Sequence, residues 1–153
     1  MLNADSAQVY RDLQVLSARP TAEEMGGIEH RLFGAWDGAV ACSAADWANT
    51  ARGEIERLHS EDAVPILVGG TGLYLRTLLE GIAPVPPIDD DVRKSIRAMS
   101  QSEARFALER EDPEAAARLA PRDAARTMRA LEVMRGTGRP LAHWQANKGG
   151  GIG

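Results

Sequence analysis

The sequence predicts an α/β fold, because strand-like and helical segments alternate along its first half. Residues 64–68, Val-Pro-Ile-Leu-Val, form a short apolar run typical of a buried parallel strand. The glycine turn Gly69–Gly72 follows this run, and Leu73 to Leu79 continues as an apolar helix. A helix, a strand, a glycine turn and a second helix in this order indicate parallel strands joined by helices.

The segments nearest the N-terminus fit the same class. Met1 to Asn3 is expected to be the end of a strand, and Asp5 to Tyr10 to begin a turn or a short helix. A loop is expected around Pro20, because proline disfavours helix in the residue before it. Residues 28–36 are expected to be extended, since Gly34 and Gly38 punctuate the end of that segment.

The helix before the apolar strand has a clear start signal. Ser43 and Asp46 have the spacing of a capping box, in which each side chain bonds the backbone of the other residue. The helix that they open carries four apolar side chains on one face: Trp47, Ala51, Ile55 and Leu58.

The second half is predicted to be helical throughout. Residues 82–88 form a stiff, proline-rich connector and are the best internal boundary. The expected helices beyond it are Asp89 to Met99, Glu103 to Arg110, Pro113 to Leu119 and Asp123 to Arg135, and residues 136–140 end the last of them. The glycine-rich tail, 149–153, has no packing pattern.

Composition narrows the function classes. The 153 residues are 44% hydrophobic and 26% charged, with no run as long as a membrane span and no signal peptide. We therefore expect a cytoplasmic protein without a membrane partner. A net charge of −4 argues against indiscriminate nucleic-acid binding, although a local basic stripe remains compatible with it. The single cysteine, Cys42, excludes an internal disulfide.

The two strand ends carry the best candidate chemistry. An aspartate at the end of a strand, Asp5, can accept a proton, and Ser6 and Gln8 can hold the polar edge of a substrate. The turn Gly69–Gly72 allows backbone N–H groups to approach an anion, although it lacks the lysine of a P-loop. The alternatives are an ordinary helix cap at Asp5 and a plain strand-to-helix turn.

Arginines stand out in the helical half. Arg122, Arg126 and Arg129 are spaced at i, i+4 and i+7 and are expected to share one face of the last helix. Few acidic residues lie near them, which suits a phosphate backbone. Arg93 and Arg97 repeat the spacing. The alternative is a solvated helix face. The three histidines are dispersed, and no metal site is predicted.

Several blocks, in order, resemble the bacterial tRNA dimethylallyltransferases. They are Asn3–Arg11, Arg19–Thr21, Gly27–Leu32, Ser43–Trp47, Pro65–Tyr74, Pro84–Pro87, Asp91–Arg93, Asp112–Arg118, Arg126–Val133 and Thr137–Leu141. The resemblance implies transfer of a dimethylallyl group from dimethylallyl diphosphate to N6 of the adenosine beside the anticodon, in tRNAs that read codons beginning with U. It also implies a P-loop-NTPase-like parallel sheet with a helical insertion.

The resemblance assigns roles to individual residues. Asp5 would be the general base or the hydrogen-bond acceptor for the exocyclic amine, and Thr71 would line the reaction channel. Ser6 and Gln8 would hold the flipped-out base, and all four residues from Asp5 to Gln8, Ala7 included, would contact the tRNA substrate. Contacts with the tRNA anticodon stem-loop would come from the helical half: Arg93, Ala125, Arg126, Thr127, Met128 and Arg129. Ala125 stands where the family usually has glutamine.

The family's first strand and its P-loop, Gly-x-Thr-x-x-Gly-Lys-Ser or Thr, precede the Asp-Ser motif. Met1 here is four residues before Asp5, so we expect a fragment that lacks the diphosphate-binding loop and the hydroxyl that anchors Mg²⁺. We also expect it to lack the C-terminal part of the family. Residues 1–83 and about 121–153 would form a partial catalytic core, and about 84–120 the tRNA-binding insertion.

The full-length family is expected to be monomeric. Two alternatives stay open for this chain: a non-catalytic tRNA-binding remnant, and a prenyltransferase that acts on free adenine nucleotides.

Overall fold

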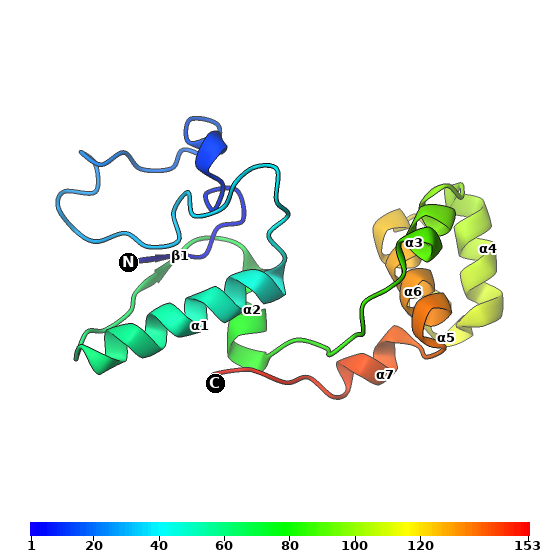
Figure 1. Ribbon diagram of the computed structural model, residues 1–153. Helices are drawn as coiled ribbons and strands as arrows, with labels where there is room; N and C mark the ends of the chain where they lie inside the picture. The colour runs from blue at the N-terminus through cyan, green and yellow to red at the C-terminus, as the bar shows by residue number, and fades with distance from the viewer. The chain divides into compact units, whose positions relative to one another are not determined.

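A computed structural model describes all 153 residues, and they form two compact units (Figure 1). Unit 1 consists of residues 1–82 and 150–153, and unit 2 consists of residues 83–149. The tail belongs to unit 1, because Ile152 and Gly153 donate backbone hydrogen bonds to the carbonyls of Leu78 and Leu79, both at 3.0 Å. The glycine-rich tail therefore packs, although its sequence has no packing pattern.

The sheet of unit 1 contains two parallel strands, β1 (Leu2–Asn3) and β2 (Leu67–Val68). Leu2 lies opposite Leu67, which confirms the predicted parallel direction. On its other side β1 exchanges hydrogen bonds with Arg31, through Asn3 N to Arg31 O and Arg31 N to Met1 O, both 2.9 Å long. The segment 28–36, expected to be extended, supplies isolated bridges at Arg31 and Trp36 and no strand.

The prediction of a buried strand at 64–68 was wrong. The residues Val64, Ile66 and Val68 are 85%, 59% and 43% exposed. The reason is that β2 pairs with β1 alone. The apolar residues of this segment are therefore not covered on both faces, as they would be inside a larger sheet.

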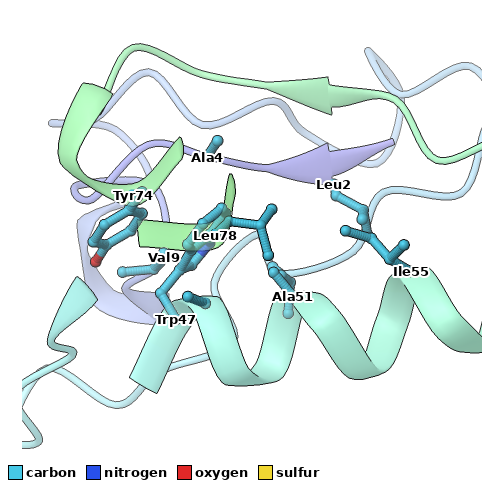
Figure 2. Packing of buried hydrophobic residues seen from close by; sticks show 10 residues of the cluster. Leu2, Ala4, Val9, Trp47, Ala51, Ile55, Tyr74 and Leu78 are labelled. Atoms are coloured by element: carbon cyan, nitrogen blue, oxygen red, sulfur yellow. The ribbon is translucent and has the colours of Figure 1, made fainter. Parts of the chain in front are cut away.

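Two helices, α1 (Ala44–Ser60) and α2 (Gly72–Glu80), pack against the sheet and share a core with β1. The capping box of Ser43 and Asp46 is confirmed at the start of α1. Figure 2 shows the core that α1 and α2 form with β1 and the segment after it, in which Trp47 stacks on Tyr74 with ring centroids 4.6 Å apart. The buried members are Leu2, Ala4, Val9, Leu32, Trp47, Ala48, Ala51, Ile55, Tyr74 and Leu78.

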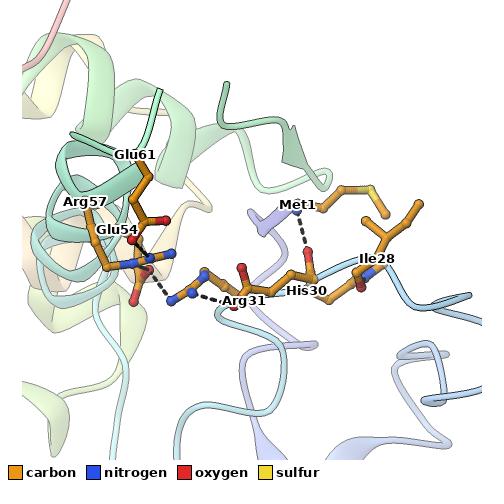
Figure 3. Close-up of polar contacts among 8 residues, drawn as sticks. Met1, Ile28, His30, Arg31, Glu54, Arg57 and Glu61 are labelled. Carbon is orange, nitrogen blue, oxygen red and sulfur yellow. Dashed lines mark hydrogen bonds and ion pairs between the residues drawn. The ribbon is translucent and has the colours of Figure 1, made fainter. Parts of the chain in front are cut away.

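Charged groups attach the segment before Leu32 to α1 (Figure 3). Arg31 pairs with Glu29 and with Glu54 of α1, the latter at 2.8 Å, and Arg57 joins Glu54 to Glu61. This ion-pair chain runs along one side of α1 and holds the strand-like segment beside β1. A short 3-10 turn, η1 (Arg11–Leu13), follows the Asp5 to Tyr10 segment.

Unit 2 is entirely helical: α3 (Asp90–Arg97), α4 (Gln101–Glu111), α5 (Pro113–Arg118), α6 (Ala124–Thr137) and α7 (Leu141–Gln145). Its core is built mainly from alanine and branched side chains: Ile96, Ala104, Leu108, Ala115, Ala116, Ala130 and Leu131. Helix α7 was not expected, since Gly138 and Pro140 end α6, but Pro140 then serves as the N-cap of a new short helix. No helix of this chain combines the length and the apolar composition that a membrane span requires.

The extent of unit 2 differs from the expected insertion at 84–120. Helix α6 packs against α3 and α4, so residues 121–149 lie in the helical unit of this structure. The division of the whole protein into a core and an insertion stays a prediction.

Unit 2 contains a bidentate ion pair whose effect depends on pH. Arg135 of α6 donates from Nε and Nη2 to the two carboxylate oxygens of Glu111 on α4, at 2.9 and 2.6 Å. These bonds lower the pKa of Glu111 below its ordinary value of 4.5. The pair therefore stabilises the folded state above pH 4.5, and this contribution is lost as the pH falls through the folded-state pKa.

We expect Glu111→Gln to lower the free energy of unfolding at pH 7 by about 1 kcal/mol, because a charged pair becomes a weaker neutral one. The difference from wild type should shrink at pH 3, because this pH lies below the unfolded-state pKa of 4.5 and part of the pair's contribution is lost there. Denaturant titrations followed by circular dichroism at both pH values test this, with Glu114→Gln as a control that has no arginine partner. A deficit of the same size at both pH values would contradict the assignment.

Candidate active site and nucleic-acid interface

The loops after β1 and β2 meet at one edge of the sheet, as expected for the carboxyl ends of parallel strands. Ala4 donates its N–H to Val68 O at 2.7 Å, and Thr71 donates its N–H to Ala4 O at 3.1 Å. The backbone at Gly69 passes so close to Ala4 that a Cβ built there would lie 2.3 Å from Ala4 C. The glycine is therefore needed for the approach of the two loops.

Asp5 is half-buried and held in one orientation. Its Oδ1 accepts hydrogen bonds from the N–H groups of Ala7, at 2.8 Å, and Gln8, at 3.3 Å. Its Oδ2 has no hydrogen-bond partner within the chain. One oxygen therefore forms the local turn, as the helix-cap reading of Asp5 expected, and the other stays free to accept a proton or a hydrogen bond. Asp5 can therefore act both as a cap of the local turn and as a proton acceptor.

Asn3 holds Asp5 in position, a role that was not predicted from the sequence. Asn3 is fully buried, its Oδ1 accepts the N–H of Asp5 at 3.0 Å, and its Nδ2 donates to the carbonyls of Asp5 and Leu32 at 3.0 and 3.3 Å. Its own carbonyl accepts from Trp47 Nε1 at 2.8 Å. The sequence does contain a signal for this role, because Asn3 is a polar amide at the end of an apolar strand.

Thr71 joins Ser6 across the two loops. Its Oγ1 accepts the N–H of Ser6 at 2.9 Å and donates to Ser6 Oγ at 3.2 Å. The hydroxyl therefore does not cap α2, although Thr71 is the N-cap residue of that helix. The structure thus brings Asp5, Ser6 and Thr71 together, whereas they are far apart in sequence.

Gln8 is engaged by a different part of unit 1. Its Nε2 donates to the carbonyls of Ser17 and Ala18, at 3.1 and 3.5 Å, so the amide nitrogen holds the loop before Pro20. Its Oε1 remains available to a ligand. Ala7 is exposed and contributes its backbone N–H to the turn.

Cys42 is not suited to nucleophilic chemistry. Burial raises the pKa of its thiol, and burial likewise raises the pKa of the neighbouring Tyr74 hydroxyl, which donates to Cys42 O at 3.4 Å. A protonated thiol is a poor nucleophile. The thiol is half-buried and packs against the core of unit 1.

The remaining candidate residues lie in unit 2. Arg126 and Arg129 are on α6, with side chains 76% and 43% exposed, and Arg126 pairs with its helix cap Asp123 at 2.5 Å. Arg122 precedes the start of α6, so the predicted stripe of three arginines on one helix was wrong. The helix cap at Asp123 sets this start.

The other members of the predicted tRNA-binding run differ in exposure. Ala125 is exposed and Met128 is half-buried, whereas Thr127 is fully buried and lies inside unit 2. Arg93 of α3 is half-buried, and its Nη1 lies 3.7 Å from Asp90.

Basic charge is concentrated in this part of the chain. Residues 113–149 contain seven Lys or Arg residues against three Asp or Glu residues, although the whole chain has a net charge of −4. A cavity of about 230 Å³ between α5, α6 and α7 has Arg118, Arg126 and Arg129 among its lining residues. An acidic protein therefore has a local surface that suits a phosphate backbone.

Comparison with known proteins agrees with the sequence resemblance. Residues 8–151 match the sequence model of the IPP transferase family. The chain is 69% identical, over its whole length, to the tRNA dimethylallyltransferase of Erythrobacter litoralis, of which it covers 48%. The chain spans about half the length of the curated relatives it matches.

Two solved structures are similar to this chain. The full-length tRNA isopentenylpyrophosphate transferase of Bacillus halodurans is 35% identical, with a TM-score of 0.53 over 91% of this chain and 48% of that one. A eukaryotic dimethylallyltransferase acting on tRNA has a TM-score of 0.79 over 96% of this chain and 38% of that one. At 24% identity this second likeness concerns the fold alone. The predicted α/β class is confirmed.

Proposed function

The chain belongs to the IPP transferase family, and we propose that its protein transfers a dimethylallyl group to N6 of an adenosine in tRNA. The observation that carries this proposal is the Asp5 carboxylate, whose Oδ1 is fixed by two backbone N–H groups while Oδ2 is free. A fixed carboxylate with one free oxygen is suited to accept a proton from an attacking amine.

The reaction needs that acceptor because the adenine amine gains a bond. The N6 nitrogen attacks the allylic carbon of dimethylallyl diphosphate, the carbon–oxygen bond breaks, and diphosphate leaves with the electron pair. The nitrogen then carries one proton too many, and Asp5 Oδ2 takes it. Ser6 Oγ and Gln8 Oε1 would hold polar edges of the base, and Thr71 would keep the two loops together.

The Mg²⁺ that the resemblance implies does not fit the residues of this chain. The structure contains no group of three or more His, Cys, Asp or Glu side chains that could hold a metal ion, and the sequence contains no P-loop. No part of the proton transfer described above is therefore assigned to a metal.

Asp5→Asn tests the proposal. Asparagine keeps an Oδ1 that can accept the N–H of Ala7, so the turn should survive, but it cannot take the proton. In the whole protein, which would also supply the P-loop that the resemblance implies, we expect prenyl transfer to an anticodon stem-loop RNA to fall about 10²- to 10⁴-fold while RNA binding stays within about twofold. The assay supplies dimethylallyl diphosphate and Mg²⁺, and Asp12→Asn is the control. Equal turnover in Asp5→Asn and wild type would contradict the role of Asp5.

The excess of basic residues in 113–149 supports a second candidate, a non-catalytic RNA-binding function. It predicts salt-sensitive binding of the stem-loop by the wild-type chain without turnover. An enzyme for free adenine nucleotides would instead convert adenosine monophosphate and would not need the arginines of unit 2.

A further inference from the structure

A buried carboxylate in unit 2 joins two exposed arginines from different helices. Glu132 of α6 has a side chain that is 5% exposed, and its Oε1 accepts a hydrogen bond from Arg97 Nε of α3 at 3.1 Å. Its Oε2 lies 3.5 Å from Arg129 Nη1, one turn earlier on α6. The side chains of Arg97 and Arg129 are themselves 67% and 43% exposed.

This arrangement leaves the guanidinium groups usable by a ligand. Glu132 engages Arg97 through Nε, so both Nη nitrogens of Arg97 have no hydrogen-bond partner within the chain. A carboxylate that is buried needs such partners, because an unpaired buried charge is costly. The three groups together carry a net positive charge, and the carboxylate restricts two long side chains that would otherwise sample many rotamers.

A cavity lies beside the pair. It has a volume of about 330 Å³ and is lined by Arg97, Ala125, Met128, Arg129 and Glu132. Ala125 and Met128 supply apolar walls, and the two arginines supply N–H donors. Guanidinium groups bind phosphate oxygens through paired hydrogen bonds, so the donors match a phosphodiester group.

We propose that Glu132 is a positioning residue, which holds Arg97 and Arg129 as a paired binding site for a phosphodiester of the RNA backbone beside this cavity. The proposal rests on the proposed function, because it takes the tRNA substrate as the ligand. It adds Arg97 to the RNA-contacting residues and gives Glu132, an acidic residue, a favourable role in binding an anion.

Neutralising Glu132 should change RNA affinity in opposite directions, depending on whether Glu132 acts through its charge or by orienting the arginines. Glu132→Gln removes a negative charge near the RNA, so electrostatics alone would tighten binding and steepen its dependence on salt. If Glu132 acts by orienting the arginines, the same change weakens binding. Arg97 and Arg129 face different oxygens of the carboxylate, and glutamine replaces one of those oxygens with an NH2 group that cannot accept from a guanidinium.

The experiment measures the affinity of the chain for an anticodon stem-loop RNA between 50 and 200 mM salt, about the range over which phosphate contacts are resolved. We expect Glu132→Gln to bind about three- to tenfold more weakly than wild type, whereas the control Glu114→Gln binds as tightly or more tightly. Arg97→Ala should lower the salt slope by about 0.7 to 0.9, the loss of one phosphate contact, and should exceed the effect of Arg110→Ala.

A double variant separates positioning from stability. If Glu132 acts through Arg97, Glu132→Gln should have a smaller effect in the Arg97→Ala background than in wild type. Thermal melts identify variants that unfold. If Glu132→Gln unfolds, the proposal is decided by Arg97→Ala alone, because Arg97 is mostly exposed and its replacement should not unfold the protein. Binding by Glu132→Gln as tight as wild type, or an Arg97→Ala slope equal to that of Arg110→Ala, overturns the proposal. If wild type does not bind the stem-loop at all, the proposed tRNA function fails, and this inference fails with it.

Discussion

Gly69→Ala is expected to separate the two loops that form the candidate active site. A Cβ at this position would lie 2.3 Å from Ala4 C, 2.5 Å from Ala4 O and 2.6 Å from Asp5 N, and all three are backbone atoms. Because a backbone cannot move aside as the end of a side chain can, Asp5 or the glycine turn must shift. We expect the free energy of unfolding to fall by about 3 kcal/mol and the hydrogen bond between Ser6 and Thr71 to be lost.

The neighbouring glycine provides a matched control. A Cβ at Gly70 would meet no atom within 4 Å, so Gly70→Ala should change stability by less than about 0.5 kcal/mol. Denaturant titrations measure both variants, and the exchange rate of the Ser6 amide proton reports on its bond to Thr71 Oγ1. Equal stability of the two alanine variants would show that the loops are not held as closely as described.

Trp47→Ala should produce the other large effect. Trp47 is fully buried, stacks on Tyr74, and donates from Nε1 to Asn3 O at 2.8 Å. Removing a buried tryptophan costs about 3–5 kcal/mol, since it creates a cavity. Unit 1 is small, so we expect Trp47→Ala to lose its cooperative unfolding transition.

A conservative change separates packing from hydrogen bonding. Trp47→Phe keeps most of the apolar contact and leaves Asn3 O without its donor, which should cost about 1–3 kcal/mol. Trp144→Phe is the control, because Trp144 is half-buried in unit 2 and its Nε1 bond to Thr137 Oγ1 is long, at 3.3 Å. A Trp47→Phe variant as stable as wild type would mean that the bond to Asn3 contributes little.

Local patterns predicted the framework of the site correctly. The capping box at Ser43 and the apolar face with Trp47 depend on spacing within one helix, and such spacing is visible in a sequence. The parallel direction of β1 and β2 was also expected, and it places the Asp5 and Thr71 loops at the same edge of the sheet. These predictions needed no knowledge of which distant residues touch.

The residues that position the site could not be predicted in this way. Asn3 matters because its amide meets the backbone of Asp5 and Leu32, and Glu132 because it meets Arg97 from another helix. In the sequence, Glu132 is simply an acidic residue near arginines. The exposure of β2 was missed for a related reason, since an apolar run does not reveal how many neighbours cover it.

The return of the tail to α2 makes unit 1 discontinuous in the chain. Residues 150–153 pair with the end of α2, so the whole of unit 2 closes a loop whose two ends are anchored at one place in unit 1. An unfolded segment of that length has many more conformations than a folded one, and closing it costs more conformational entropy. Folding of unit 2 therefore strengthens the attachment of the tail to α2 through chain connectivity.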